Sequence, residues 1–216
     1  MRTVVWNLLL GGVVAACLQL LAGQAATAAE ADAWPSLKPA TEAIPNLRVV
    51  SPALVRGGQP SEEGLKLLKD AGIKTIVNLR NEEVLVAREE RIARKLGLKF
   101  VNIPLDAFNQ PTDSDIRKFL SAVDDSANRP VFVHCLYGQD RTGTMVGIYR
   151  IKYQGWTASQ AFDEMVACGF KPGLANLTRA VYGYAAYNGR PEKMPGADVI
   201  VRDLKRRLQA RFNGGQ

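Results

Sequence analysis

The sequence predicts an α/β fold, with a central and mostly parallel sheet flanked by helices and a C-terminal half that is helical. Short segments rich in β-branched residues alternate with amphipathic segments of helical period between residues 47 and 133. From residue 143 to residue 188 only helical patterns follow. Such alternation is typical of a parallel or mixed sheet covered by helices. With 216 residues, of which 47% are apolar, the chain can bury one core of ordinary size, and no internal repeat divides it.

Start and stop signals along the chain bound the predicted elements. Ser61 caps a helix that ends at Gly72, and Gly97 stops the charged helix that follows the second strand. Thr112 or Asp113 begins the next helix. We expect short strands within residues 47–55, 74–79, 100–103 and 130–133. We expect helices over residues 62–71, 83–96, 113–124, 143–154, 157–168 and 174–188.

The N-terminal segment has the composition of an export signal. Arg2 supplies a positive charge near the start, and residues 3–29 carry no charge. Residues 26–28 read Ala-Thr-Ala, which matches a cleavage site, so residues 1–28 are predicted to be a signal peptide. An uncleaved inner-membrane anchor is one alternative, because the apolar stretch is long enough to span a bilayer. A lipoprotein is another, since residues 14–17 resemble a lipobox. All three place the domain outside the cytoplasm, and we expect it in the periplasm.

The remaining domain boundaries follow from changes in composition. Residues 29–46 are rich in Ala and Pro and are predicted to be an irregular linker or an edge segment, and residues 47–190 are predicted to form the folded domain. Residues 191–216 are predicted to be a basic helical tail. Within it, residues 198–212 have the pattern of an amphipathic helix, which we expect to pack on the domain as an exposed terminal helix.

The most specific feature of the chain is the segment 134–143, which reads HCLYGQDRTG and follows a buried strand. Five residues separate Cys135 from Arg141, enough to wrap backbone N–H groups around a tetrahedral oxyanion that the guanidinium clamps with two hydrogen bonds. A helix that begins after this loop favours negative charge at its N-terminus. A helix N-terminus and an arginine lower the pKa of a thiol, so we expect Cys135 to be a thiolate nucleophile. The Thr142 hydroxyl can stabilise the sulfur when it leaves.

The whole loop is predicted to bind phosphate. Gly138 provides a backbone conformation that a side chain would hinder and permits close approach to phosphate. Asp140 is expected to orient the loop rather than to donate a proton. The chain has one histidine and only scattered acids, so we expect no metal and no cofactor. The predicted phosphate-binding residues are Cys135, Leu136, Tyr137, Gly138, Gln139, Asp140 and Arg141.

The pattern His-Cys-x5-Arg-Thr resembles the signature of the cysteine-dependent protein tyrosine and dual-specificity phosphatases. The chain is similar to small bacterial members of the TpbA type, which are exported to the periplasm, over roughly residues 54–187. Residues 56–60, 74–80 and 149–156 share in this similarity. The resemblance implies a dual-specificity-phosphatase fold and hydrolysis of phosphomonoesters through a cysteinyl-phosphate intermediate. It also implies that His134 shapes the loop, and general-base catalysis by this residue is the weaker alternative.

Loss of the leaving group requires a general acid on a nearby loop. Asp106 is our candidate, because it lies on a Pro-bounded loop between a strand and a helix. In the resembled family an Asp stands about thirty residues before the nucleophile, as Asp106 does here. The alternative for this residue is a turn former. Asp113 is the second candidate for the acid, although Asp113 and Asp115 read more simply as residues that start a helix.

Three further residues have two possible interpretations each. Cys168 ends an apolar helix and is expected to be a buried inert thiol, with a redox partnership with Cys135 left open. Arg56 could contact the loop or form a salt bridge at a strand end. Trp156 is more often a core residue than a ligand platform. We place none of the three among the catalytic residues.

Charge and loop composition indicate the substrate class. A net charge of +7, spread along the chain, attracts acidic or phosphorylated partners, and no basic stripe interleaved with aromatic residues predicts nucleic-acid binding. The loop interior, residues 136–140, carries no Lys or Arg, which favours a singly phosphorylated target over polyphosphorylated ones. We expect a monomeric phosphoprotein phosphatase for phosphotyrosine, and for phosphoserine and phosphothreonine as further substrates. Membrane contact is expected only through the N-terminal segment.

Other functions remain open from the sequence. An inositol phosphate or phospholipid phosphatase uses the same loop chemistry on another substrate. A catalytically silent module that recognises phosphate would keep the loop without turnover. A rhodanese-type sulfur transferase also uses a cysteine loop with an arginine, but Thr142, Gly143 and the Asp106 loop fit phosphoryl transfer better.

Overall fold

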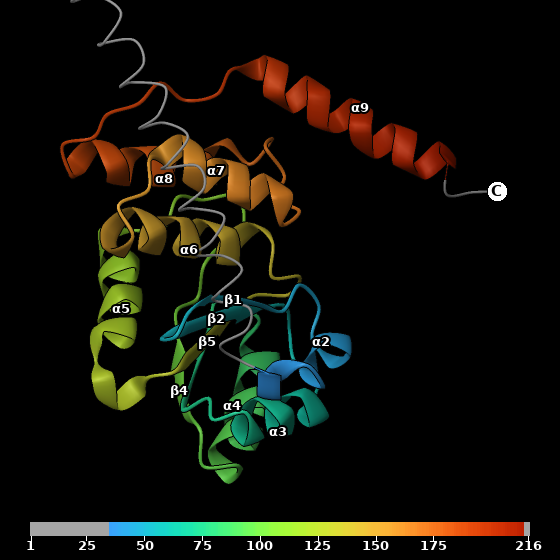
Figure 1. Ribbon diagram of the computed structural model, residues 1–216, viewed down its shortest axis with the longest axis vertical. Coiled ribbons are helices and arrows are strands. Elements are labelled where there is room, and N and C mark those ends of the chain that lie inside the picture. The colour runs from blue at the N-terminus through green and yellow to red at the C-terminus, as the bar shows by residue number, and fades with distance from the viewer. Residues whose placement is uncertain (1–34, 214–216) are drawn as a thin grey trace, which may run out of the picture.

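Five strands form one sheet in the order β1-β2-β5-β3-β4 in the computed structural model, which describes residues 35–213 (Figure 1). The strands are β1 Arg48–Ser51, β2 Leu54–Gly57, β3 Thr75–Asn78, β4 Lys99–Asn102 and β5 Val131–His134. Only β1 runs antiparallel to its neighbour, so the sheet is mostly parallel, as the sequence predicts. The predicted signal peptide, residues 1–28, lies outside the described residues. Within residues 35–213 no helix is long and apolar enough to cross a bilayer.

Helices cover both faces of the sheet and form a further layer beyond it (Figure 1). The helices are α2 Ala40–Ala43, α3 Glu62–Asp70, α4 Glu83–Lys95, α5 Asp113–Asp124, α6 Asp140–Tyr153, α7 Ala158–Ala167, α8 Ala175–Tyr187 and α9 Ala197–Asn213. Short 3-10 turns stand at Pro35–Leu37 and Ser126–Asn128. Helices α2, α3 and α4 pack on one face, α5 and α6 pack on the other, and α7 and α8 pack on α6.

The central strand β5 is buried on both faces, which explains its continuous apolar sequence. Val131 and Val133 point into the core beneath α5 and α6, whereas Phe132 points into the core beneath α2 and α3. All three side chains are fully buried. The chain leaves this strand at His134, so Cys135 stands at the carboxyl end of the sheet, where open α/β sheets bind ligands.

Helix α6 holds the other end of the loop and is the most buried helix in the described part of the chain. Its residues from Asp140 to Ile151 are all buried, because the sheet, α5, α7 and α8 surround it. Such a helix has no exposed polar face. The segment between β5 and α6 is therefore fixed at both ends in the interior of the domain.

The short strand predicted within residues 47–55 is β1, and a second strand that was not predicted, β2, follows it in a hairpin. Strands β1 and β2 pair antiparallel around a turn in which the Ser51 hydroxyl accepts a hydrogen bond from the Ala53 N–H at 3.2 Å. Such local bonds to serine side chains favour turns over continued strand. Because β2 extends to Gly57, this glycine lies in register with His134.

The described part of the predicted linker, residues 35–46, is ordered structure rather than an irregular connection. It contains α2, and the side chains of Leu37, Ala40 and Ile44 are buried in the core beside Phe132. The prediction failed because its apolar residues are few and are interrupted by prolines, which hides their shared burial. The folded domain therefore begins before residue 47.

Helix α9 agrees with the predicted amphipathic helix within one residue at each end. Val199 packs against the core of α7 and α8, but the helix then runs away from the domain (Figure 1). Val201 is 48% exposed and Leu204 is 56% exposed. The expected packing on the domain is thus confined to the first turns.

We predict that Ile44→Ala lowers the free energy of unfolding by about 2–5 kcal/mol, because it removes a fully buried side chain from the core. Glu42→Ala, at an exposed position of the same segment, should change this free energy by less than about 0.5 kcal/mol. Urea unfolding followed by circular dichroism measures both. Equal, small effects would show that residues 35–46 do not contribute to the core.

Candidate active site

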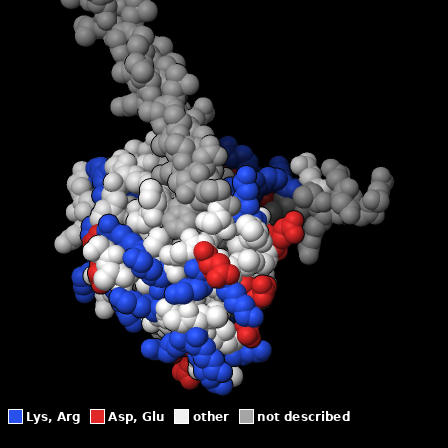
Figure 2. Space-filling view, turned by 60° about the horizontal axis from the view of Figure 1, so that its bottom comes forward, with Lys and Arg blue, Asp and Glu red and all other residues white. Residues whose placement is uncertain are grey.

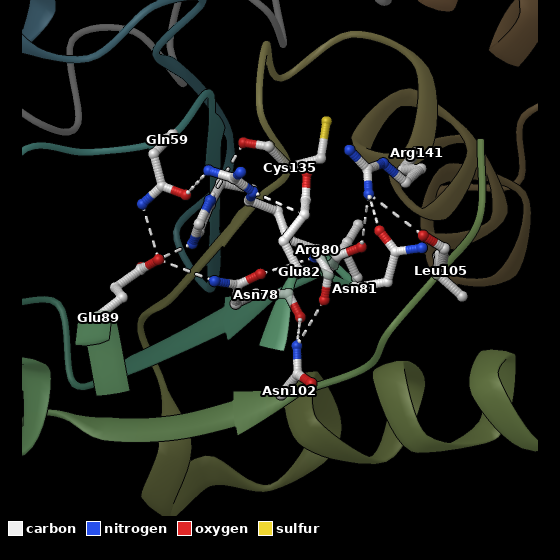
Figure 3. A network of polar contacts seen from close by, with 12 residues as sticks. Gln59, Asn78, Arg80, Asn81, Glu82, Glu89, Asn102, Leu105, Cys135 and Arg141 are labelled. Carbon is white, nitrogen blue, oxygen red and sulfur yellow. Dashed lines mark hydrogen bonds and ion pairs between the residues drawn. The ribbon is translucent and has the colours of Figure 1, made fainter. Parts of the chain in front are cut away.

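The loop that follows β5 is the centre of the site. Cys135 is its first residue and is only 3% exposed, and the loop ends where α6 begins at Asp140. Figure 3 shows polar side chains near it, which come from the ends of β3 and β4, from the segment after β2 and from the helices α4 and α6. The sequence motif is therefore folded as a strand, a tight loop and a helix, as predicted.

Hydrogen bonds from outside the loop hold its carbonyl groups. The backbone N–H of Gln59 donates to Leu136 O at 3.0 Å. The Asn46 side-chain amide donates to Tyr137 O at 3.0 Å. The Arg56 guanidinium donates through Nη2 to Gly138 O at 2.8 Å. Three consecutive carbonyl oxygens are thereby turned away from the middle of the loop.

The backbone N–H groups of the loop consequently face its interior. In a trans peptide the C=O and the following N–H point in opposite directions. Within the described residues, the N–H groups of residues 136–139 donate no hydrogen bond. Successive N–H groups that converge in this way bind anions. The loop can therefore offer donors to a tetrahedral oxyanion next to Cys135.

Gly138 is required at its position for two reasons. Its φ is +69°, a backbone conformation that favours glycine. A Cβ atom on this residue would lie 2.4 Å from the carbonyl carbon of Gly57 and 2.6 Å from the nitrogen of Gly58. The loop thus packs backbone against backbone on the end of β2. The sequence predicted the special conformation, but not this contact.

Arg141, in the first turn of α6, is held by oxygen atoms from two other loops. Its Nη1 donates to Leu105 O at 3.2 Å, and to Leu79 O and the Asn81 Oδ1 at 3.4 Å each. These bonds occupy one nitrogen, and within the described residues Nε and Nη2 make no hydrogen bond. In Figure 3 the free edge of this guanidinium and the Cys135 sulfur point to the same side of the network. This edge can donate two hydrogen bonds to an oxyanion.

His134 is buried next to Cys135, and oxygens on both sides of its ring fix the imidazole. Nδ1 lies 3.2 Å from Cys135 O, and Nε2 lies 2.8 Å from the Glu89 Oε1, off the line of an ideal hydrogen bond. Phe132 stacks on the ring at 5.5 Å between centroids. The imidazole therefore has no free nitrogen for a substrate, which agrees with a role in shaping the loop.

Glu89 links His134 to the neighbouring strand and loop (Figure 3). Its Oε2 accepts hydrogen bonds from the Gln59 amide at 2.7 Å and from the Asn78 amide at 2.8 Å. Gln59 in turn accepts a hydrogen bond from Arg80 at 2.8 Å. This network joins α4, β3 and the segment after β2, so it supports the loop from below.

Arg80 also sets the charge at the rim of this network. Its Nε donates to the Glu82 carboxylate at 3.0 Å. This hydrogen bond lowers the pKa of Glu82 below its ordinary value, and the charge of Arg141 contributes to the same shift. Glu82 therefore stays ionised and is unsuited to donate a proton.

The loop that carries Asp106 adjoins Arg141, because Leu105 O is one of the oxygens that hold the guanidinium. The Asp106 side chain is exposed, and its Oδ1 accepts hydrogen bonds from the Phe108 N–H at 2.5 Å and the Asn109 N–H at 3.3 Å. It thus forms the turn that was the alternative for this residue. Within the described residues Oδ2 makes no hydrogen bond. The assignment of Asp106 as the acid stays a prediction.

The competing acids stand at a helix start, as predicted. Asp113 is the first residue of α5, and Asp115 forms a capping box with Thr112. Asp140 is engaged elsewhere, since its Oδ1 accepts from the backbone N–H of Lys171 at 3.0 Å and its Oδ2 lies 3.3 Å from the ammonium group. Asp140 therefore ties the loop to the segment between α7 and α8.

The structure also places the four other residues that the sequence analysis considered. Thr142 is fully buried, and its hydroxyl has no hydrogen-bond partner in the described structure, so its role toward the sulfur of Cys135 stays a prediction. Cys168 is a free, buried thiol at the end of α7. Arg56 contacts the loop instead of forming a strand-end salt bridge. Trp156 is half-buried, and the Cζ atom of Arg150 lies 4.4 Å from the centre of the Trp156 ring.

The sequence analysis missed most of the residues that support the loop. Asn46 is distinguished by its backbone φ of +53°, which the structure shows and the sequence does not. Gln59 stands in the segment that shares in the family resemblance, without a stated role. Asn78, Asn81 and Glu89 lie far from the motif in sequence, and only the topology of the sheet brings them beneath it.

A protein-family model described as DSP-PTPase phosphatase fused to NAD+ kinase matches residues 39–179. NAD kinase 2, chloroplastic, of Arabidopsis thaliana is 40% identical over 104 residues, which are 45% of this chain and 10% of that protein. The dual specificity protein phosphatase TpbA of Pseudomonas aeruginosa (strain UCBPP-PA14) is 30% identical over 126 residues, 58% of this chain and 55% of that protein. Inositol diphosphatase DSP4 of Arabidopsis thaliana is 31% identical over 123 residues, 55% of this chain and 61% of that protein.

Solved structures show the same fold. The crystal structure of P. aeruginosa TpbA superposes with a TM-score of 0.55 at 26% identity and covers 64% of this chain and 84% of that chain. The core catalytic domain of the PP-IP phosphatase SIW14 from S. cerevisiae, in complex with citrate, gives a TM-score of 0.58 at 25% identity and covers 67% of this chain and 93% of that chain.

The similarity covers only part of the length of NAD kinase 2 and of TpbA. The chain spans a tenth of the length of the plant NAD kinase and about half the length of TpbA. What is shared contains both β5 and the loop at its end, within the 39–179 match. The sequence signature, the α/β fold and the family model agree, and the chain belongs to the family of DSP-PTPase phosphatases.

Proposed function

We propose that this protein is a cysteine-dependent phosphatase that hydrolyses phosphotyrosine in proteins, with phosphoserine and phosphothreonine as further substrates. The observation that carries this proposal is the loop beside the buried thiol of Cys135. The carbonyls of residues 136–138 are held from outside the loop, and the N–H groups of residues 136–139 donate no hydrogen bond within the described residues. An arginine with a free edge stands at the end of the same loop. This arrangement serves a phosphoryl group that must be bound, attacked and released.

The reaction proceeds in two displacements on phosphorus. The thiolate of Cys135 attacks phosphorus, the P–S bond forms, and the ester P–O bond breaks with transfer of a proton from Asp106 to the leaving oxygen. Water then attacks the cysteinyl phosphate and gives its proton to the Asp106 carboxylate. The P–S bond breaks, and phosphate and the thiolate are regenerated. The Thr142 hydroxyl, which has no other partner in the described structure, stabilises the departing sulfur.

Arg141 and the loop supply electrostatic stabilisation. The transferred phosphoryl group spreads negative charge over its three equatorial oxygens, and donors that are already oriented lower the barrier. Arg141 is oriented by three oxygens before substrate binds. The N–H groups are oriented by bonds to the carbonyls behind them. Neither set must reorganise when substrate binds.

Two exposed aromatic side chains support an aromatic phosphoester as substrate. Phe108, on the Asp106 loop, is 73% exposed, and Tyr137, within the phosphate loop, is 56% exposed. The Lys171 ammonium group lies 5.9 Å from the Tyr137 ring centre. Apolar rings on both loops suit the phenyl ring of phosphotyrosine better than a polyanionic sugar alcohol.

The surface charge favours anionic partners in general. Lys and Arg outnumber acidic residues over the face shown in Figure 2. Exposed basic residues on the α3 and α4 side of the molecule include Lys69, Arg91, Arg94 and Lys95. Such a surface raises the local concentration of phosphorylated substrates. We further propose a periplasmic location, which rests on the predicted signal in residues 1–28 and which cell fractionation tests.

The substrate class is tested by side-by-side hydrolysis. The named relatives include a dual specificity protein phosphatase and an inositol diphosphatase. We predict a larger kcat/KM for a phosphotyrosyl peptide than for inositol polyphosphates or diphosphoinositol phosphates, since residues 136–140 carry no basic side chain. Release of inorganic phosphate at equal enzyme concentrations measures this ratio. Faster turnover of the inositol substrates would reverse the assignment.

We predict that two variants both lose turnover but differ in phosphate binding. Cys135→Ser should abolish hydrolysis and keep the affinity for inorganic phosphate within a few-fold, because the N–H groups and Arg141 remain. Arg141→Ala should lose both turnover and about 10- to 100-fold in phosphate affinity. Arg141→Lys is the matched control, since it keeps the charge without the two-pronged geometry and should fall between them. Hydrolysis that survives in Cys135→Ser would exclude the proposed nucleophile.

The role of Asp106 is tested through the leaving group. Asp106→Asn should slow hydrolysis of alkyl phosphates by about 10²- to 10⁴-fold, because an alkoxide needs a proton to leave. It should slow p-nitrophenyl phosphate much less, since p-nitrophenolate is a good leaving group. Asp113→Asn, at the start of α5, serves as control and should leave both rates unchanged. Equal losses on both substrates would assign the acid to another residue.

A further inference from the structure

Arg56 is a fully buried cation under the phosphate loop. It lies in β2, in register with Val133 of β5, so its side chain points to the face of the sheet that α6 covers. Its Nη2 lies 3.7 Å from the place of a Cβ atom on Gly143, in the first turn of α6. The guanidinium is therefore enclosed between β2, the loop and the start of the helix.

This guanidinium has no negative partner among the described residues. Its one hydrogen bond runs from Nη2 to Gly138 O, and its Nε and Nη1 are buried without a hydrogen-bond partner. Arg80 and Arg150, which are also buried, differ, because Arg80 contacts Glu82 and Arg150 contacts Glu164. A buried charge that lacks a partner is strongly destabilising. An anion close by is needed to compensate it.

The peptide that Arg56 contacts lies between the guanidinium and the interior of the loop. The Gly138 carbonyl accepts from Arg56, and the Gln139 N–H of the same peptide points the opposite way, toward the site of the oxyanion. Hydrogen bonds in series polarise one another. Positive charge behind the carbonyl therefore strengthens the N–H as a donor in front.

We infer that Arg56 is a positioning residue and the second cation of the phosphate site, which acts on the bound oxyanion through the Gly138–Gln139 peptide. This inference rests on the proposed function. Arg141 binds the oxyanion directly from one side, and Arg56 supports it from behind the loop without touching it. The negative charge of the thiolate and of the bound phosphate compensates the buried guanidinium.

The neighbouring carbonyls show that a cation is not needed for holding the loop alone. Leu136 O is held by a backbone N–H, and Tyr137 O is held by the neutral Asn46 amide, at 3.0 Å each. Of these three carbonyls, only that of Gly138 is bonded to a charged group. A neutral donor at residue 56 would supply the same structural bond but not the charge.

Titration of the full chain with tungstate, a non-hydrolysable oxyanion, separates charge from structure. Arg56→Gln keeps a donor and loses the charge, Arg56→Met loses both, and Arg56→Lys keeps the charge. We expect Arg56→Gln and Arg56→Met to bind tungstate about 10- to 100-fold more weakly than wild type, and Arg56→Lys to recover most of this loss. Unchanged affinity in Arg56→Gln, or Arg56→Lys as weak as Arg56→Met, would overturn the inference.

Two control variants test whether a change of net charge or of stability alone alters tungstate binding. Lys74→Met removes one positive charge from an exposed site just before β3, at the end of the sheet opposite to the loop, and should bind tungstate as wild type does. Leu68→Ala removes a fully buried side chain on the opposite face of the sheet and should lower the melting temperature without changing the affinity. Should Arg56→Met not fold, the comparison of Arg56→Gln with Arg56→Lys decides, because both carry polar side chains.

Hydrolysis assays on the same variants keep this inference distinct from the proposed function. If wild type hydrolyses p-nitrophenyl phosphate and Arg56→Gln is equally active with equal tungstate affinity, the inference fails and the function stands. If wild type shows no hydrolysis that depends on Cys135, the function fails. A fall in kcat/KM that parallels the fall in tungstate affinity, with partial rescue by Arg56→Lys, supports both.

Discussion

The site depends on the hydrogen bonds that hold the carbonyl groups of the loop away from its centre. Left to itself, a short glycine-containing segment samples many backbone conformations, and fixing each residue costs about 1–2 kcal/mol. Here the Gln59 N–H, the Asn46 amide and the Arg56 guanidinium each bond to one carbonyl. Because each peptide is planar, these bonds also aim the N–H groups inward. In the function that we propose, anion binding is therefore prepared by residues that never touch the anion.

The sheet order explains how residues from distant parts of the chain reach this loop. Strand β5 lies between β2 and β3, so its carboxyl end is flanked by the segments that follow both neighbours. The segment after β2 supplies Gln59, and the end of β3 supplies Asn78 and Asn81 around Glu89 and Arg141. The close contact of residue 138 with the backbone of Gly57 is possible because Gly138 has no Cβ atom.

The loop from Cys135 to Arg141 and the elements beside it could be predicted from the sequence, because each has a local cause. Caps at Ser61 and Thr112, the apolar run of β5 and the spacing of Cys135 and Arg141 are read from neighbouring residues. The β1–β2 hairpin and the burial of Ile44 could not be predicted, since they depend on contacts with β5 and α3. For the same reason Glu89 was missed, although it adjoins the only histidine.

The position of a bound oxyanion tests the central claim most directly. A crystal structure of the protein with tungstate would locate it by its strong scattering. The account predicts tungstate within hydrogen-bond distance of the N–H groups of residues 136–139 and of the Arg141 guanidinium, in contact with the Cys135 sulfur. Tungstate bound elsewhere, with the loop carbonyls turned inward, would contradict it.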